Sequence, residues 1–151
     1  MKILVAFDSS EPSKHALDQG VDIARLIEGE LLILSVIPRV MVPVFSDEGF
    51  GAAPISAAHE MTEYQEKMRE IYAKSLKEVE ENIAENYPEL KVTTKLLEGR
   101  PSSTIVEQAE KDDVNLIVIG SRGLGGITGW ILGSTSRRVV ESCTVPILIV
   151  K

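Results

Sequence analysis

The chain of 151 residues has one cysteine, Cys143, and two histidines, His15 and His59. A single thiol cannot form an internal disulfide bond, so we expect a protein that folds in a reducing compartment, the cytoplasm. Neither histidine has a neighbour that resembles a metal ligand, and no serine–histidine–acid or cysteine–histidine grouping is evident. The sequence therefore predicts no metal site and identifies no catalytic residue.

Basic residues are fewer than acidic ones, with 16 Lys and Arg against 23 Asp and Glu, so the formal net charge is −7. Such a chain gains little from phosphate attraction, and we expect no nucleic-acid partner. Long apolar runs are absent as well, and none approaches the roughly 18 residues that cross a membrane. Because the chain begins directly with a strand-like run, we also expect no signal peptide and no membrane partner.

The length fits one domain with a full core, and the 44% hydrophobic content is typical of globular proteins. We expect a single domain over residues 1–151, with a long loop at about 39–59. That segment has no clean period and contains two prolines and two glycines. Because long structureless connections are uncommon unless functional, we interpret it as either a lid over the site or part of a subunit contact.

Apolar, β-prone runs alternate with segments of helical period along the rest of the chain. We expect strands at 2–7, 31–37, 90–97, 116–119 and 146–150, and helices at 13–28, 60–87, about 99–111 and 134–142. In the second helix, one apolar stripe is expected to face the core; it comprises Tyr64, Met68, Ile71, Leu76, Val79 and Ile83.

This alternation predicts an α/β fold, with an open parallel five-stranded sheet, right-handed crossovers and helices on both faces. In such sheets, ligands bind beyond the carboxyl ends of the strands, where the strand order reverses. If the strand order is 3-2-1-4-5, the first and fourth strands are neighbours, and Asp8 and Gly120 flank one crevice. Periodicity alone does not establish that order, so it is a hypothesis at this stage.

The segment from Gly120 to Thr135 is rich in glycine and directly follows the apolar run 116–119. Glycines allow a backbone to approach a ligand closely. The helix that begins at Ser134 would point free N–H groups and the positive end of its dipole back toward those glycines, an arrangement that suits phosphate. The segment therefore predicts a nucleotide pocket. It contains neither a Walker-type phosphate loop nor a complete G-x-G-x-x-G pattern, which excludes a Walker-type hydrolase.

The spacing Gly120-x2-Gly123-x9-Gly133-Ser134 resembles the ATP-binding signature of the universal stress protein family. The opening run 3–10 and the closing run 145–150 are similar to that family as well, so the resemblance covers essentially the whole chain. It implies a single-domain, ATP-binding member with a Rossmann-like fold of the adenine nucleotide alpha hydrolase-like kind. It also implies a homodimer formed through the fifth strand, about Pro146–Val150.

The resemblance further implies which residues surround the adenosine. The backbone of Ala6 and Phe7 would border the adenine, and Val36 would present backbone groups to its edge. Asp8 would accept hydrogen bonds from ribose hydroxyls, as an ionised carboxylate can. Gly120 would let the ribose approach. The residues alone leave a second reading open for Asp8, which could cap the first helix instead.

A second group of matching residues is implied for the phosphates. Arg122 and Gly123 would border the triphosphate, and the basic side chain suits a charge-assisted contact. Gly133, Ser134 and Thr135 would offer backbone N–H and hydroxyl donors. From the residues alone, Arg122 could equally be a solvated charge and Ser134 a plain helix cap.

Taken with the resemblance, the sequence predicts an ATP-binding universal stress protein that acts as a nucleotide-responsive switch or scaffold for an unidentified protein partner. One alternative is a weak ATPase or autophosphorylating enzyme, with Mg²⁺ bridging the phosphates; nothing in the sequence supplies a base, so turnover would be slow. Another is that AMP, cyclic AMP or a different adenine nucleotide is the ligand. The last is a dimerisation module that keeps the fold without binding.

Overall fold

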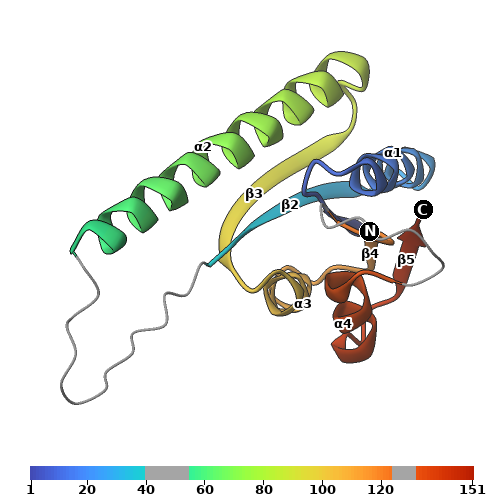
Figure 1. Ribbon diagram of the computed structural model, residues 1–151. Coiled ribbons are helices and arrows are strands. Elements are labelled where there is room, and N and C mark those ends of the chain that lie inside the picture. Colours follow the sequence, from blue (N-terminus) through green and yellow to red (C-terminus); the bar gives the residue numbers. More distant parts are fainter. Residues whose placement is uncertain (40–54, 124–131) are drawn as a thin grey trace.

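The computed structural model describes residues 1–39, 55–123 and 132–151. Strands and helices alternate along these residues as expected (Figure 1). The elements are β1 (Lys2–Ala6), α1 (Glu11–Leu26), β2 (Glu30–Pro38), α2 (Ile55–Asn86), β3 (Lys91–Gly99), α3 (Pro101–Lys111), β4 (Leu116–Gly120), α4 (Ser134–Ser142) and β5 (Ile147–Val150).

The second helix begins earlier than its apolar period predicts. It starts at Ile55 rather than Glu60, so residues 55–59 of the expected loop, His59 included, are helical. Alanines 57 and 58 are strong helix formers but carry no amphipathic signal, which explains why the pattern did not reveal this first turn. Residues 40–54 lie outside the described residues, and the interpretation of the loop as a lid or subunit contact stays a prediction.

All five strands are parallel and lie in the order β3-β2-β1-β4-β5, which confirms the expected topology. β1 is the central strand, and its Leu4 is paired with Leu32 of β2 and Ile117 of β4. The chain moves outward from β1 to β3 and then returns to place β4 on the other side of β1. The strand order therefore reverses between β1 and β4, where open parallel sheets bind ligands.

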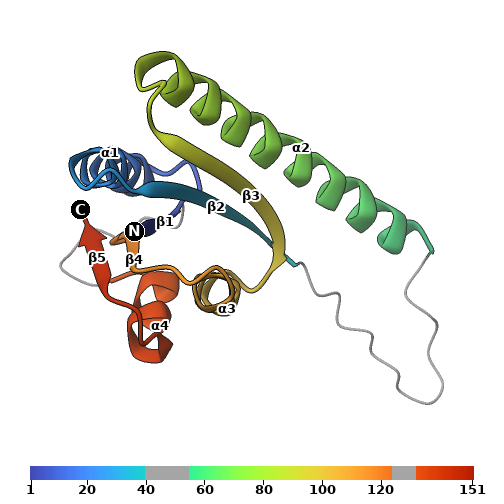
Figure 2. The same ribbon diagram turned by 180° about the vertical axis from the view of Figure 1, so that it is seen from behind.

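The sheet is covered on both faces, as Figures 1 and 2 show: α1 and α2 lie on one side, α3 and α4 on the other. Successive side chains of β1 feed the two cores in turn. Ile3 and Val5 pack with α1 and α2, whereas Leu4 and Ala6 pack with α3 and α4. Burial on both faces explains why β1 reads as a continuous apolar run rather than an alternating one.

The apolar stripe of α2 differs in part from the prediction. Tyr72, Leu76 and Ile83 are buried, but Tyr64 and Ile71 leave 51% and 61% of their surface exposed. The buried positions are spaced by four and seven residues, which keeps them on one helix face. Ile71 is adjacent to Tyr72 in sequence and so is turned about 100° away. Assigning these two side chains to the core was therefore wrong.

A buried serine of β2 is bonded to the residue that directly follows β1. Ser35 is 1% exposed, and its hydroxyl donates to the Phe7 carbonyl over 2.6 Å. The Phe7 N–H in turn donates to the Leu34 carbonyl over 2.9 Å. These two bonds hold the backbone of Phe7, and hence the position of Asp8, beyond the last residue of the strand.

Replacing Ser35 with alanine is expected to lower the free energy of unfolding by about 1–2 kcal/mol, because a buried carbonyl loses its partner. Urea denaturation measures the change. Ser142→Ala is the matched control, since the Ser142 hydroxyl also donates to a carbonyl, that of Arg138, but in the exposed last turn of α4. That control should change stability by less than about 0.5 kcal/mol. Equal losses in the two variants would contradict a special role for the Ser35 bond.

Candidate functional site

A cavity of about 510 Å³ lies at the carboxyl ends of β1, β2 and β4. Its volume falls within the range of ordinary ligand pockets, about 300–1,000 Å³. All of the residues singled out from the sequence line it, although they come from six separate elements and loops. They are Ala6, Phe7, Asp8, Val36, Gly120, Arg122, Gly123, Gly133, Ser134 and Thr135. Residues 124–131 of the glycine-rich segment lie outside the described residues.

The cavity also has walls that the sequence did not reveal. These are Ser13, Leu34, Pro38, Tyr72, Pro101, Ile105, Ile119, Leu132 and Ser136. Leu34 and Ile119 could have been predicted from the alternation of side chains along the strands. Leu34 is on the same face of β2 as Val36, and Ile119 is paired with Ala6 at the end of β4. Tyr72 of α2 and Ile105 of α3 have no local signal, since only the fold brings their helices to this edge of the sheet.

Asp8 has one carboxylate oxygen engaged by its own loop. Its Oδ1 accepts from the backbone N–H of Ser10 over 3.0 Å and from the Ser10 hydroxyl over 2.5 Å. The cap of α1 is Ser10 itself, whose Oγ accepts from the N–H of Ser13. Asp8 therefore orients the capping residue instead of capping the helix. Within the described residues its other oxygen, Oδ2, has no hydrogen bond and lies beside Gly123, where an added Cβ would be 2.5 Å away.

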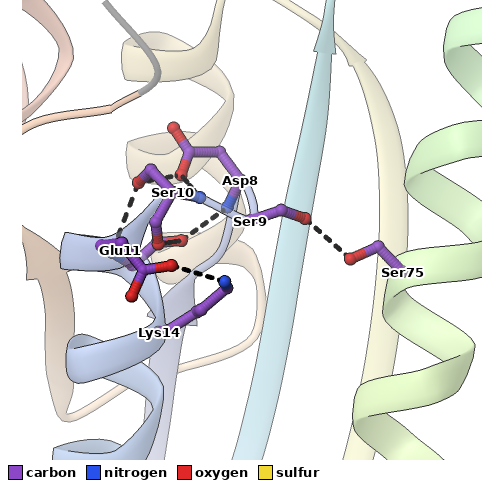
Figure 3. Close-up of polar contacts among 7 residues, drawn as sticks. Asp8, Ser9, Ser10, Glu11, Lys14 and Ser75 are labelled. Carbon is purple, nitrogen blue, oxygen red and sulfur yellow. Dashed lines mark hydrogen bonds and ion pairs between the residues drawn. The ribbon is translucent and has the colours of Figure 1, made fainter. Parts of the chain in front are cut away.

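Ser9 connects this loop to α2. Its backbone has a φ of 67°, a left-handed conformation that is costly for a residue other than glycine. The Ser9 and Ser75 hydroxyl oxygens are 2.7 Å apart. Figure 3 shows Ser9 directed across to Ser75 on α2, while Ser10 turns back to Asp8. The strained backbone thus sends successive side chains in different directions and leaves Asp8 at the cavity.

Gly120 ends β4 where the backbone of α1 begins. A Cβ at this position would lie 2.7 Å from the carbonyl carbon of Pro12 and 2.8 Å from its oxygen. No side chain fits between the two backbones. The glycine is therefore needed for packing at this point, whatever contact it makes with a ligand.

The N-terminus of α4 is held against the end of β4. The Gly133 N–H donates to the Ser121 carbonyl over 2.8 Å, and the Ser136 hydroxyl donates to the same carbonyl over 2.9 Å. The first N–H groups of a helix lack intrahelical partners, and Ser134 and Thr135, the first two residues of α4, line the cavity. No acidic residue lies in the first turn of α4. This arrangement favours an anion.

Two titratable groups, Asp8 and Tyr72, line the cavity. Burial raises the pKa of the Tyr72 hydroxyl above its usual 10.0, and the nearby charge of Asp8 raises it further. Tyr72 is consequently neutral at physiological pH. Across residues 1–39, 55–123 and 132–151, no cluster of three or more His, Cys, Asp or Glu side chains could hold a metal ion. No helix in these ranges is both long and apolar enough to cross a membrane.

Comparison with known proteins places the chain among one family. The model of the universal stress protein family matches residues 1–151. The chain is 35% identical to universal stress protein YxiE of Bacillus subtilis over 150 residues, which cover 99% of this chain and 98% of that protein. The structure of the universal stress protein UspA from Lactobacillus plantarum has the same fold, with a TM-score of 0.81 and 22% identity over 100% of this chain and 97% of that one.

Two further solved structures share the fold and contain ligands. One is a universal stress protein in complex with cAMP, with a TM-score of 0.59 and 22% identity over 100% of this chain and 96% of that one. The other is the universal stress protein from Archaeoglobus fulgidus in complex with dAMP, with a TM-score of 0.59 and 21% identity over 100% and 98% of the two chains.

The packing at Gly120 leads to a stability prediction. Gly120→Ala should lower the free energy of unfolding by about 2–3 kcal/mol, because the added methyl group meets the rigid backbone of Pro12. Gly99→Ala is the control, because a Cβ there meets the hydroxyl of Thr104, which can rotate away. Chemical denaturation of the two variants makes the comparison. A loss at Gly120 no larger than that at Gly99 would contradict the close backbone contact.

Proposed function

The chain belongs to the universal stress protein family, and we propose that it binds an adenine nucleotide, ATP, in the cavity beyond β1 and β4. The observation that carries the proposal is the convergence of residues from distant parts of the sequence. Asp8 after β1, Val36 in β2 and the glycines around β4 and α4 line one cavity of ligand size. If the glycines served only a backbone turn, residues from distant parts of the sequence would not need to meet in one cavity.

The cavity combines the surfaces that an adenylate needs. Apolar side chains from two elements, those of Val36 and Pro38 in β2 and Ile105 in α3, offer a wall for the flat purine. Asp8 Oδ2, left over from the bonds to Ser10, is an acceptor for sugar hydroxyls. At the α4 end, the free N–H groups of Ser134 and Thr135 suit phosphate oxygens.

The solved complexes with cAMP and dAMP support an adenylate, because those proteins share the fold. In our proposal the triphosphate is the physiological ligand, and AMP and cyclic AMP are the alternatives. We further propose that the ATP-bound form acts in the cytoplasm as a switch or scaffold for a protein partner. Bound ATP can shift such a switch only through different affinities for its two states.

Asp8→Asn tests the site directly. The change removes the charged acceptor and should weaken ATP binding at least about tenfold, because hydrogen bonds to charged groups contribute about 1.5–3 kcal/mol. Asp22→Asn removes the same charge from an exposed position of α1 and should leave binding unchanged. Isothermal titration calorimetry with ATP, AMP and cyclic AMP measures both effects and ranks the ligands. If the wild type binds none of the three, or if Asp8→Asn binds like wild type, the proposed site is wrong.

The sheet edge supports the proposed homodimer. β5 lies at the end of the sheet, and the carbonyls of Pro146 and Val150 accept hydrogen bonds from the N–H groups of Ile117 and Ser121. In a parallel strand, alternate residues direct both backbone groups to the same side. Ile147 and Ile149 therefore direct theirs away from β4, toward the open edge. We propose that these groups pair with β5 of a second copy.

Ile149→Pro should disrupt that dimer, because proline removes one outward N–H without touching a bond to β4. In sedimentation equilibrium the wild type is expected at twice the chain mass of 16.5 kDa, and the variant at 16.5 kDa. Ile149→Val keeps the N–H and should remain dimeric. Circular dichroism establishes that the proline variant is folded. A monomeric wild type, or a folded Ile149→Pro dimer, would show that the edge of β5 is not the interface.

A further inference from the structure

Tyr72 is one of the cavity residues that lie outside the family signature. Tyr72 belongs to α2 and lines the same cavity as Asp8, with only 9% of its surface exposed. Within the described residues its hydroxyl has no hydrogen-bond partner. No fully buried side-chain polar atom among the described residues lacks a partner, so the Tyr72 oxygen is accessible from the cavity and can meet a ligand there. The other two tyrosines do not line the cavity. Tyr64 is 51% exposed, and the Cζ atom of Arg25 lies over the ring of Tyr87, 4.3 Å from the centroid of that ring.

The fold brings the part of α2 that carries Tyr72 close to the loop that carries Asp8. Ser75 follows Tyr72 by three residues, about one turn of α2, and its hydroxyl contacts that of Ser9, the residue after Asp8. Figure 3 shows this contact and the neighbouring Asp8 side chain. The charge of Asp8 also raises the pKa of Tyr72, after the larger effect of burial, so the phenol stays protonated at neutral pH. It is therefore available as a donor at the Asp8 end of the cavity.

The other hydroxyls near Asp8 are already engaged. The Ser10 hydroxyl donates to Asp8 Oδ1, and the Ser13 hydroxyl donates to the Ser10 carbonyl over 2.8 Å. Asp8 can only accept. A sugar hydroxyl that donates its proton to Asp8 Oδ2 still has lone pairs to satisfy, and in a buried site an unsatisfied oxygen is costly. Among the described residues near Asp8, the phenol of Tyr72 is the side-chain donor without an assigned partner.

We propose that Tyr72 is a specificity-determining residue. Its phenol donates a hydrogen bond to the same sugar hydroxyl whose proton is donated to Asp8, and the site thereby selects ribonucleotides over deoxyribonucleotides. This inference rests on the proposed binding of an adenine nucleotide at the same site. The phenol and the carboxylate satisfy the donor and the acceptor of a single hydroxyl group. A site built in this way discriminates against the ligand that lacks the hydroxyl, since both protein groups are then left without partners.

Tyr72→Phe removes the hydroxyl and keeps the ring. Isothermal titration calorimetry is carried out with the 5′-mono- and 5′-triphosphates of adenosine, 2′-deoxyadenosine and 3′-deoxyadenosine. Binding of the adenosine nucleotides should weaken about 3- to 10-fold, the effect of one lost hydrogen bond. Binding of the deoxynucleotide that lacks the contacted hydroxyl should change less than about twofold, because the bond is already missing. The variant thus loses the preference for ribose that the wild type shows.

Two controls separate this role from a structural one. Tyr64→Phe makes the same chemical change on the exposed part of α2 and should leave all affinities unchanged. Without ligand, Tyr72→Phe should keep the wild-type melting temperature, since the hydroxyl has no partner among the described residues.

Each remaining outcome overturns the inference. Equal weakening for all three sugars would assign Tyr72 to the base or the phosphates, and unchanged affinities would remove it from recognition altogether. Failure of the wild type to bind any adenine nucleotide would remove the proposed function as well. Wild-type binding with an unaffected Tyr72→Phe variant would remove this inference alone.

Discussion

The site depends on the contact between two backbones, at Gly120 and Pro12. Because residue 120 has no Cβ, the start of α1 lies directly against the end of β4. That contact brings the loop after β1 beside the loop after β4, so that Asp8 Oδ2 lies next to Gly123. A Cβ at residue 123 would meet only that carboxylate, the end of a side chain that can move, so the backbone contact at Gly120 is the stricter of the two constraints.

The architecture was predictable because its signals are local and strong. Strands buried on both faces, such as 116–119, stand out as apolar runs between polar segments, and the alternation with helices implies parallel pairing. The strand order was a hypothesis, and the structure confirms it. The predicted site residues could be named because the glycine spacing and the acid after the first strand are visible in the sequence. That they line one cavity is now an observation; that they contact a ligand remains a prediction.

The contribution of α2 could not be predicted, for a physical reason. Its predicted apolar stripe included Ile71 and left out Tyr72, and a shift of one position turns a side chain by about 100°. The packing of Leu76 and Ile83 against the core decides in favour of Tyr72. Tertiary packing, rather than any local pattern, therefore brings a phenol to the cavity. The same limitation applies to Ile105, because only the packing of α3 on the sheet brings that side chain to the cavity.

The strained loop between β1 and α1 explains why Asp8 is available at all. A left-handed backbone at Ser9 costs on the order of 1 kcal/mol and persists only where the surroundings determine it. Here the Ser10 cap, the bonds from Ser10 to Asp8 Oδ1 and the contact with Ser75 all hold the same conformation. The same conformation leaves Asp8 at the cavity, which agrees with the proposed role of Asp8 in binding.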